Sequence, residues 1–258
     1  MSANSLLSPL ISLIKKIKKN HLNHQNQSNP GQDKKINLEN KHCSVYLHRK
    51  QSNVGIIERK EREKAEMRRR IVDVAVKMIV EEGYEKVSIR NIADKIEYSP
   101  ATIYLYYKDK DQLLYDVQTE AFATLASDFM TQITAEQPFK RLEQLAKAYV
   151  QFSRVHPELY DLMFIIKAPM NALVEKEKWE NGDPAYDALH NLMQECIDKK
   201  LVKFSDATIA TLSVWGFAHG LISLHLRGRC SKVSRVADED MPAVVDEAIR
   251  EYLRMIKA

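Results

Sequence analysis

The sequence predicts an all-α protein in which a three-helix N-terminal domain with a helix-turn-helix precedes a larger helical domain. Three observations predict this fold. Only 7 of the 258 residues are glycine and 8 are proline, whereas helix-favouring residues such as Ala, Leu, Glu and Lys are plentiful. Apolar residues recur at helical spacing from about residue 57 onward. Strong helix start signals occur at Ser88, Ser99-Pro100 and Asp109.

The positive charge of the chain is concentrated in its first 56 residues. The formal net charge is +4, but residues 1–56 hold nine Lys and Arg residues against Asp33 and Glu39. The remaining residues therefore sum to −3. The basic isoelectric point consequently gives no support for nucleic-acid binding by the folded part of the chain.

Residues 1–56 are expected to form a disordered basic arm. Residues 5–19 combine an apolar helical stripe with four lysines, and residues 20–53 are polar, rich in Asn and Gln, and aperiodic. The first segment either has no role or lies on an anionic membrane surface. The histidines and the cysteine of the arm match no zinc-binding spacing. A further alternative is that translation begins at Val54, so that the arm is absent from the native protein.

The first helix is expected from about Ile57 to Glu82, within a domain spanning residues 57–112. Its first half mixes Glu with Arg and Lys at i,i+4 spacing, and its second half is amphipathic. Gly83 is well placed to end it in the left-handed conformation. The run Arg68-Arg69-Arg70 is either a solvated face or a set of phosphate contacts.

Two short helices follow. Ser88 caps the first, and Ile89, Ile92, Ala93 and Ile96 form its buried stripe. After a turn at Glu97-Tyr98, Ser99 and Pro100 begin the second, which is expected to end near Tyr106. Ile103 and Tyr107 are expected to point inward, and Asp109 with Gln112 to cap the next helix.

Two helices joined by a tight turn, the second short and polar-faced, suit insertion into a DNA major groove. Periodicity alone is equally compatible with an ordinary helical corner, so this alternative stays open at this point.

These residues resemble the TetR family of bacterial transcriptional repressors. The resemblance rests on Gly83-Tyr84, the SIRNIA run at 88–93, the SPATIY run at 99–104, Tyr107, and KDKDQLL at 108–114. It implies an all-helical homodimer whose affinity for a palindromic DNA operator changes when a small-molecule effector binds the C-terminal domain. It also implies a set of DNA-binding residues: Ser88, Arg90, Ser99, Ala101, Thr102, Tyr104, Tyr106 and Lys110. Of these, Ala101 and Tyr106 would face bases. The sequence departs from the family at Glu97, where a glycine is usual.

Residues 113–258 are expected to form the ligand-binding and dimerisation domain. Helices are expected over about 109–133, 139–154, 157–165, 184–200, 206–227 and 242–256, with a loop or broken helix at 168–184. The helix at 206–227 is apolar nearly all round and carries a stripe of small residues, which predicts burial against more than one neighbour. We expect it to form half of an intersubunit four-helix bundle with the last helix. The expected interface residues are Ser213, Gly216, Gly220, Val245, Ile249 and Tyr252.

A second resemblance lies in this domain. HPELYDLMF at 156–164 and WGFAHG at 215–220 resemble a subgroup of the same family that is named for a Trp-His-Gly signature. Residues expected to line an effector pocket are Met163, Phe164, Trp215 and His219. For His219 the alternative is a hydrogen-bonded core residue.

No catalytic residues are predicted, because the sequence lacks GxSxG, GxGxxG and HExxH motifs. The three cysteines are isolated, which indicates a reducing compartment and hence the cytoplasm. No metal site and no cofactor are expected. The function predicted is that of a ligand-responsive, dimeric, DNA-binding regulator and repressor. The alternatives are a helical scaffold or binding protein, and a membrane-surface regulator that uses the basic N-terminal segment.

Overall fold

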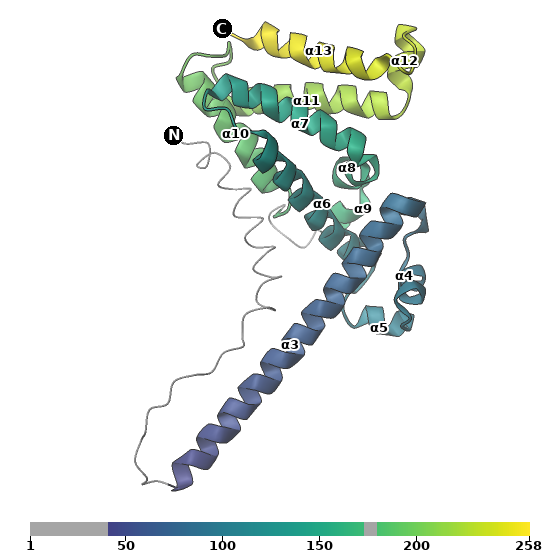
Figure 1. Cartoon of the computed structure of the whole chain (residues 1–258), viewed down its shortest axis with the longest axis vertical. Helices are drawn as coiled ribbons and strands as arrows, with labels where there is room; N and C mark the ends of the chain where they lie inside the picture. Colours follow the sequence, from purple (N-terminus) through teal and green to yellow (C-terminus); the bar gives the residue numbers. More distant parts are fainter. Residues whose placement is uncertain (1–40, 173–179) are drawn as a thin grey trace.

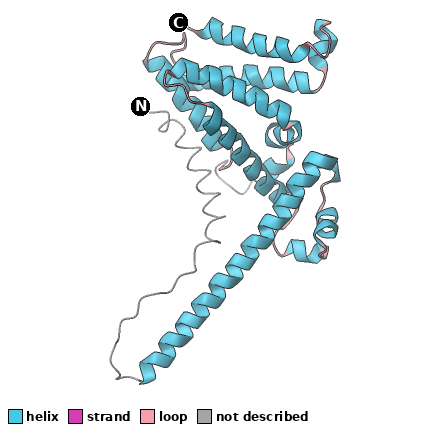
Figure 2. Cartoon of the chain, viewed as in Figure 1, coloured by secondary structure: helices cyan, strands magenta, loops and turns pink. Residues whose placement is uncertain are grey.

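The computed structural model describes residues 41–172 and 180–258, and side chains from residue 58 onward. The expected amphipathic segment at 5–19 and most of the expected disordered arm lie outside the described residues, as does part of the loop expected at 168–184. Within the described residues every regular element is helical (Figure 2), apart from one isolated β-bridge between Val202 and Lys257. The predicted all-α fold is therefore confirmed.

The N-terminal domain is built on one long helix. It comprises α3 (Lys41–Glu82), the 3-10 turn η1 (Tyr84–Lys86), α4 (Ile89–Ile96) and α5 (Pro100–Tyr104). Helix α3 begins at Lys41, well before the expected Ile57, so residues 41–56 of the arm, which we expected to be disordered, are helical. That stretch contains no proline and only one glycine, Gly55, so it lacks a strong helix terminator. Figure 1 shows α3 projecting past α4 and α5.

The C-terminal domain follows the expected order of helices. It comprises α6 (Lys110–Gln132), α7 (Pro138–Val155), α8 (Pro157–Phe164), α9 (Ala168–Asn171), α10 (Asp183–Asp198), α11 (Ala207–Leu226), α12 (Arg229–Ser234) and α13 (Met241–Ile256). The short helix α12 was not expected. Helices α11 and α13 lie at the opposite end of the molecule from α4 and α5 (Figure 1), with α6 leading from one domain into the other.

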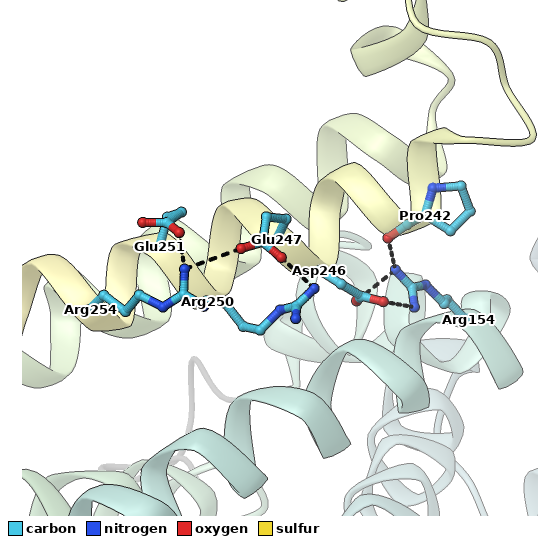
Figure 3. Close-up of polar contacts among 7 residues, drawn as sticks. All are labelled: Arg154, Pro242, Asp246, Glu247, Arg250, Glu251 and Arg254. Atoms are coloured by element: carbon cyan, nitrogen blue, oxygen red, sulfur yellow. Dashed lines mark hydrogen bonds and ion pairs between the residues drawn. The ribbon is translucent and has the colours of Figure 1, made fainter.

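An arginine joins α7 to the start of α13. The guanidinium of Arg154 donates to both carboxylate oxygens of Asp246, at 2.9 and 3.1 Å, and to the carbonyl of Pro242 at 2.7 Å (Figure 3). Further along the exposed side of α13, Arg250 pairs with Glu247, and Arg254 with Glu247 and Glu251. Exposed pairs of this kind contribute little to stability, whereas the two-pronged Arg154 contact fixes where α13 begins.

Two residues expected at a subunit interface are instead buried inside the subunit. Val245 is 1% exposed and Ile249 is 5% exposed, because this stripe of α13 packs on α7 and α11 of its own chain. The apolar residues that do reach the surface of α11 and α13 are Ile209, Leu212, Phe217, Leu224, Val244 and Met255. The expected interface residues Ser213, Gly220 and Tyr252 are half-buried and Gly216 is exposed, with Tyr252 stacked on Phe217 at 4.2 Å between ring centroids.

Helix α11 is, in the described part of the chain, the only helix long and apolar enough to cross a membrane. A single helix of this kind is weak evidence for a membrane span, since core helices of globular proteins share its length and composition. Here α11 packs against α7, α10, α12 and α13, which accounts for much of its apolar character.

Candidate nucleic-acid interface

Helices α4, α5 and α6 each begin with a side-chain cap, as the sequence predicted. At the start of α4 the Ser88 hydroxyl accepts a hydrogen bond from the backbone N–H of Asn91 at 3.1 Å. At the start of α5 the Ser99 hydroxyl accepts one from the backbone N–H of Thr102 at 3.2 Å. At the start of α6 the Asp109 carboxylate accepts a hydrogen bond from the backbone N–H of Gln112 at 2.8 Å. These caps satisfy amides that the first turn of a helix leaves without a backbone partner.

The turn between α4 and α5 is held in a left-handed conformation by a residue that is not glycine. Glu97 has φ 61° and ψ 40°, and the following amide, that of Tyr98, donates to the Ala93 carbonyl at 3.0 Å. The turn therefore has the geometry that glycine adopts without strain, although the sequence supplies glutamate. For a residue with a Cβ this conformation costs roughly 1–2 kcal/mol.

Replacing Glu97 by glycine should stabilise the protein by about 0.5–1 kcal/mol, because the left-handed strain exceeds the added chain entropy of glycine. The melting temperature should rise by about 1–4 °C in a thermal unfolding experiment followed by circular dichroism. Glu81→Gly is the matched control: Glu81 is an exposed residue inside α3, where glycine should instead lower stability. Equal destabilisation by both changes would show that Glu97 is not strained.

Two arginines of α3 brace the two short helices. Arg68 donates to the carbonyl of Tyr106 at 2.6 Å and lies over the Tyr107 ring at 5.2 Å. Arg70 donates to the carbonyl of Ile96 at 3.3 Å, at the end of α4, and lies over the Tyr98 ring at 5.6 Å. Both guanidiniums thus satisfy carbonyls that helix ends leave open. Arg68 and Arg70 are therefore engaged within the domain, so the arginine run is neither a purely solvated face nor a set of three free phosphate contacts.

The outer face of α5 carries Ala101, Tyr104 and Leu105. Ala101 is exposed, the Tyr104 ring is 57% exposed and Leu105, just after the helix, is 76% exposed. Ile103 and Tyr107 are buried, as predicted, and Thr102 is half-buried with its hydroxyl 3.0 Å from that of Ser99. The spacing i, i+3, i+4 places the three exposed residues on one side of the helix.

Tyr106 does not belong to that outer face. It is half-buried against the core, and its carbonyl is taken by Arg68. Leu105 occupies the outward position instead, and we did not single it out from the sequence. Because Leu105 lies four residues after Ala101, helical spacing would have predicted it on the same face as Ala101.

The two basic residues expected to contact DNA, Arg90 and Lys110, differ in their surroundings. Arg90 is exposed in the first turn of α4. The Lys110 ammonium lies 4.2 Å from the centre of the Tyr84 ring, and burial lowers the pKa of this lysine, with Glu85 and Asp111 opposing that effect. The Tyr84 ring therefore holds the charge of Lys110, the first residue of α6, in place by a cation–π contact.

Three of the four residues expected at an effector pocket, Phe164, Trp215 and His219, come together between α8 and α11. Ring centroids are 5.6 Å apart for Phe164 and His219, 6.1 Å for Phe164 and Trp215, and 6.0 Å for Trp215 and His219. The fourth, Met163, is buried in α8. Two tyrosines that sequence reasoning missed complete the cluster: the Tyr160 hydroxyl lies 2.7 Å from Nδ1 of His219, and Trp215 donates to the Tyr149 hydroxyl at 3.4 Å.

His219 is a hydrogen-bonded, neutral residue in this cluster. Burial lowers its imidazole pKa, and the nearby charge of Arg227 lowers it further. Burial likewise raises the pKa of Tyr160, so its hydroxyl stays protonated. Among the residues that the structure describes, no group of His, Cys, Asp and Glu is arranged to hold a metal ion.

The aromatic cluster contacts α6, the helix that leads to the N-terminal domain. Phe122 of α6 meets Phe164 edge-on at 5.7 Å between ring centroids. The buried Gln118 amide, one turn earlier in α6, donates to the carbonyl of Met163 at 3.1 Å. Gln118 was also missed from the sequence, where a glutamine among apolar positions of α6 was the available signal.

Comparison with known proteins agrees with this arrangement. Residues 71–117 match the family described as bacterial regulatory proteins, tetR family, and residues 142–252 match the tetracyclin repressor-like C-terminal domain. Together these matches cover more than half of the chain, and the second includes both segments on which the resemblance of this domain rests.

Individual relatives are more distant. The chain is 26% identical over 140 residues to the HTH-type transcriptional repressor KstR of Mycobacterium tuberculosis, a match that covers 48% of this chain and 64% of that protein. It thus spans just under two thirds of that relative.

Two solved structures share the fold. A protein of unknown function from Rhodococcus sp. RHA1 has a TM-score of 0.58 at 21% identity, covering 74% of this chain and 95% of that one. The fatty acid degradation regulator FadR from Bacillus halodurans has a TM-score of 0.54 at 18% identity, covering 70% and 93%. With the caps of α4 and α5, the left-handed turn between them and the helical C-terminal domain, the two family matches at 71–117 and 142–252 show that the chain belongs to the TetR family of bacterial regulatory proteins.

Proposed function

We propose that this protein is a homodimeric transcriptional repressor that binds a palindromic DNA operator and releases it when a small-molecule effector binds the C-terminal domain. The observation that carries the proposal is the outer face of α5, which presents Ala101, Tyr104 and Leu105 beside a capped, braced turn. The repressor role follows the TetR family and the relative KstR, and the cytoplasm is the compartment in which such a regulator acts.

In the proposed complex α5 enters the major groove. Ala101 and Leu105 offer apolar contacts suited to thymine methyl groups. Contacts to the DNA backbone come from Arg90, the Ser88, Ser99 and Thr102 hydroxyls, the Tyr104 hydroxyl and the Lys110 ammonium. These groups position the protein, because phosphate contacts carry register and no base identity. Two subunits place their α5 helices about one helical turn apart, about 34–36 Å.

The proposed dimer interface is the surface of α11 and α13 that remains apolar and exposed. Leu212 is 52% exposed, Ile209 61% and Met255 68%. Gly216 and Gly220 lie in the middle of α11, and apart from the adjacent backbone of α11 no atom of the described residues comes within 4 Å of where their Cβ atoms would be. Glycine inside a helix costs about 1 kcal/mol, and close approach of a partner helix supplies a reason for it.

The effector is proposed to act next to the aromatic cluster of Phe164, Trp215 and His219. That cluster contacts α6 through Phe122 and Gln118, and α6 begins at Lys110 in the DNA-binding surface. An effector that binds one position of α8 better than another shifts α6 and so changes the separation of the two DNA-binding domains. The polar groups within reach are hydroxyls and an imidazole, which favour a largely apolar effector.

The proposal is tested by selecting duplexes from a randomised pool with the full-length protein. The expected result is enrichment of a palindrome bound by two subunits, measured by sequencing and by sedimentation of the complex. Leu212→Glu should yield monomers and weaken binding of that palindrome at least about 10-fold, because an acid in an apolar interface loses its hydration without a partner.

Val155→Glu is the matched control, since Val155 is 56% exposed on α7 and lies outside the proposed interface. It should leave both the sedimentation coefficient and the DNA affinity unchanged. A pool that shows no enrichment would instead favour a helical scaffold protein, and binding of the parent to anionic vesicles through residues 1–53 would favour a membrane-surface regulator.

A further inference from the structure

We infer that the part of α3 that precedes Arg68 is a second DNA-contacting element, which lies against the phosphate backbone next to the major groove filled by α5. The inference rests on the proposed function and extends it beyond the helix-turn-helix. The length of α3, the face on which α4 sits, and the distribution of charge along that face support it.

Helix α3 continues far beyond the domain that it supports. Arg68, which binds the Tyr106 carbonyl just after α5, marks the level at which the helix leaves that domain. From there to Lys41 the helix spans about 40 Å at about 1.5 Å per residue. This is more than three times the roughly 12 Å width of a major groove. Figure 1 shows this part of α3 passing α5 and extending beyond it.

One face of α3 bears α4, and α5 in turn packs on α4. Ile71, Ala75 and Met78 are buried on that face, where α3 packs on α4. Because successive residues rotate by about 100°, Lys64 and Lys60 lie within about 20° of the line through Ile71. Both lysines are exposed. They therefore continue, beyond α5, the same face that holds the DNA-binding domain.

The acidic residues of this segment avoid that face. By the same rotation of about 100° per residue, Glu61 and Glu63 lie about 80° to either side of the Ile71 line, and Glu58 and Glu66 lie about 140° away. The segment as a whole mixes both signs of charge, but from residue 58 to 67 the charged side chains nearest the Ile71 line, Lys60 and Lys64, are both basic. A duplex docked on α5 is wider than that short helix and so meets this basic face.

The opposite face supplies a matched control. Arg62 and Arg69 lie about 160–180° from the Ile71 line, are exposed, and belong to the same helix. Arg69 pairs with Asp73 at 3.7 Å, and exposed pairs of this kind contribute about 0–1 kcal/mol. Glutamine keeps the helix propensity of lysine and arginine, so both double substitutions remove two charges and preserve the helix.

The experiment compares Lys60→Gln/Lys64→Gln with Arg62→Gln/Arg69→Gln in the full chain. The probe is the duplex selected by the parent protein, with about 12 base pairs of flanking DNA on each side, a length that about 40 Å of helix can follow. Affinity is measured by fluorescence anisotropy from 50 to 300 mM salt. Each phosphate contact contributes about 0.9 to the slope of log affinity against log salt, so four lysines in the dimer should lower it by about 3.6.

The expected result is a lower slope for the Lys60/Lys64 variant only, at unchanged circular dichroism and melting temperature. Equal slopes for both variants and the parent would overturn the inference, because the helix would then lie clear of the duplex. An equal drop in the salt slope of both variants would overturn the inference as well, because the lost charges would then act equally from either face of α3. A parent protein that selects no duplex would reject the proposed function itself, an outcome visible before either variant is made.

Discussion

Ala101→Glu should weaken operator binding at least about 100-fold while leaving the fold intact. Ala101 is exposed on the outer face of α5, where the proposed complex brings it against base edges and between phosphate-lined strands. A carboxylate there meets like charge and loses hydration, at a cost of several kcal/mol per subunit. The affinity is measured by anisotropy with the selected duplex at one fixed salt concentration.

Stability should not change, because Ala101 is at the second position of α5, where an acidic side chain is favoured by the helix dipole. Two controls separate charge from position. Ala237→Glu adds the same charge at an exposed site between α12 and α13, and Ala101→Ser adds a hydroxyl without charge. Both should bind DNA nearly as the parent does. Unchanged affinity for Ala101→Glu would mean that α5 does not face DNA.

Local signals were enough to predict where α4, α5 and α6 begin, although they missed the start of α3. Ser88, Ser99 and Asp109 each cap the helix that the sequence assigned to them. Capping depends on one side chain and the amides two or three residues later, so no information from elsewhere in the chain is needed. The left-handed turn at Glu97 came from the family resemblance, because glutamate itself gives no signal for such a conformation.

Contacts between segments far apart in sequence could not be predicted in this way. Arg68 reaches a carbonyl 38 residues later and Arg70 one 26 residues later, yet a run of three arginines reads as a solvated face. Gln118 bonds to α8 across 45 residues. Helical periodicity places a side chain on a face, but which partner covers that face depends on the tertiary arrangement.

The interface assignment in α13 was wrong in part for the same reason. Val245 and Ile249 form a genuine apolar stripe, but α7 and α11 of the same subunit cover it. A sequence pattern does not distinguish burial within a subunit from burial between subunits. On α5, Tyr106 was assigned outward because the helix was expected to run through it, whereas α5 ends at Tyr104.

Glu195→Gln should destabilise the C-terminal domain by about 3 kcal/mol, the lower end of the cost of breaking a buried ion pair. Arg141 on α7 is only 2% exposed, and its guanidinium bonds to Glu195 on α10. Its Nε and Nη1 atoms are buried without a hydrogen-bond partner among the residues that the structure describes. Glu195 therefore supplies the balancing negative charge beside a cation that water barely reaches. The melting temperature should fall by roughly 6–12 °C at matched protein concentration.

The destabilisation caused by Glu195→Gln should become smaller as the pH falls. Burial raises the pKa of Glu195, but the hydrogen bond from Lys199 and the charge of Arg141 outweigh it, so the pKa lies below its usual value. A carboxylate with a depressed pKa in the folded state stabilises the protein above its unfolded pKa of about 4.3. That stabilisation is lost as the pH falls through the folded pKa. The stability difference between parent and Glu195→Gln should therefore be largest at neutral pH and shrink below about pH 4.

Glu251→Gln is the matched control, because Glu251 also pairs with an arginine, Arg254, but is 54% exposed. It should change the unfolding free energy by less than about 1 kcal/mol. In Arg141→Met/Glu195→Leu both charges are replaced by apolar side chains, which should recover most of the loss, since a buried pair replaced as a whole is often neutral or stabilising. If the double variant were as unstable as Glu195→Gln, the cost would lie in packing between α7 and α10. Only recovery in the double variant assigns it to the uncompensated charge of Arg141.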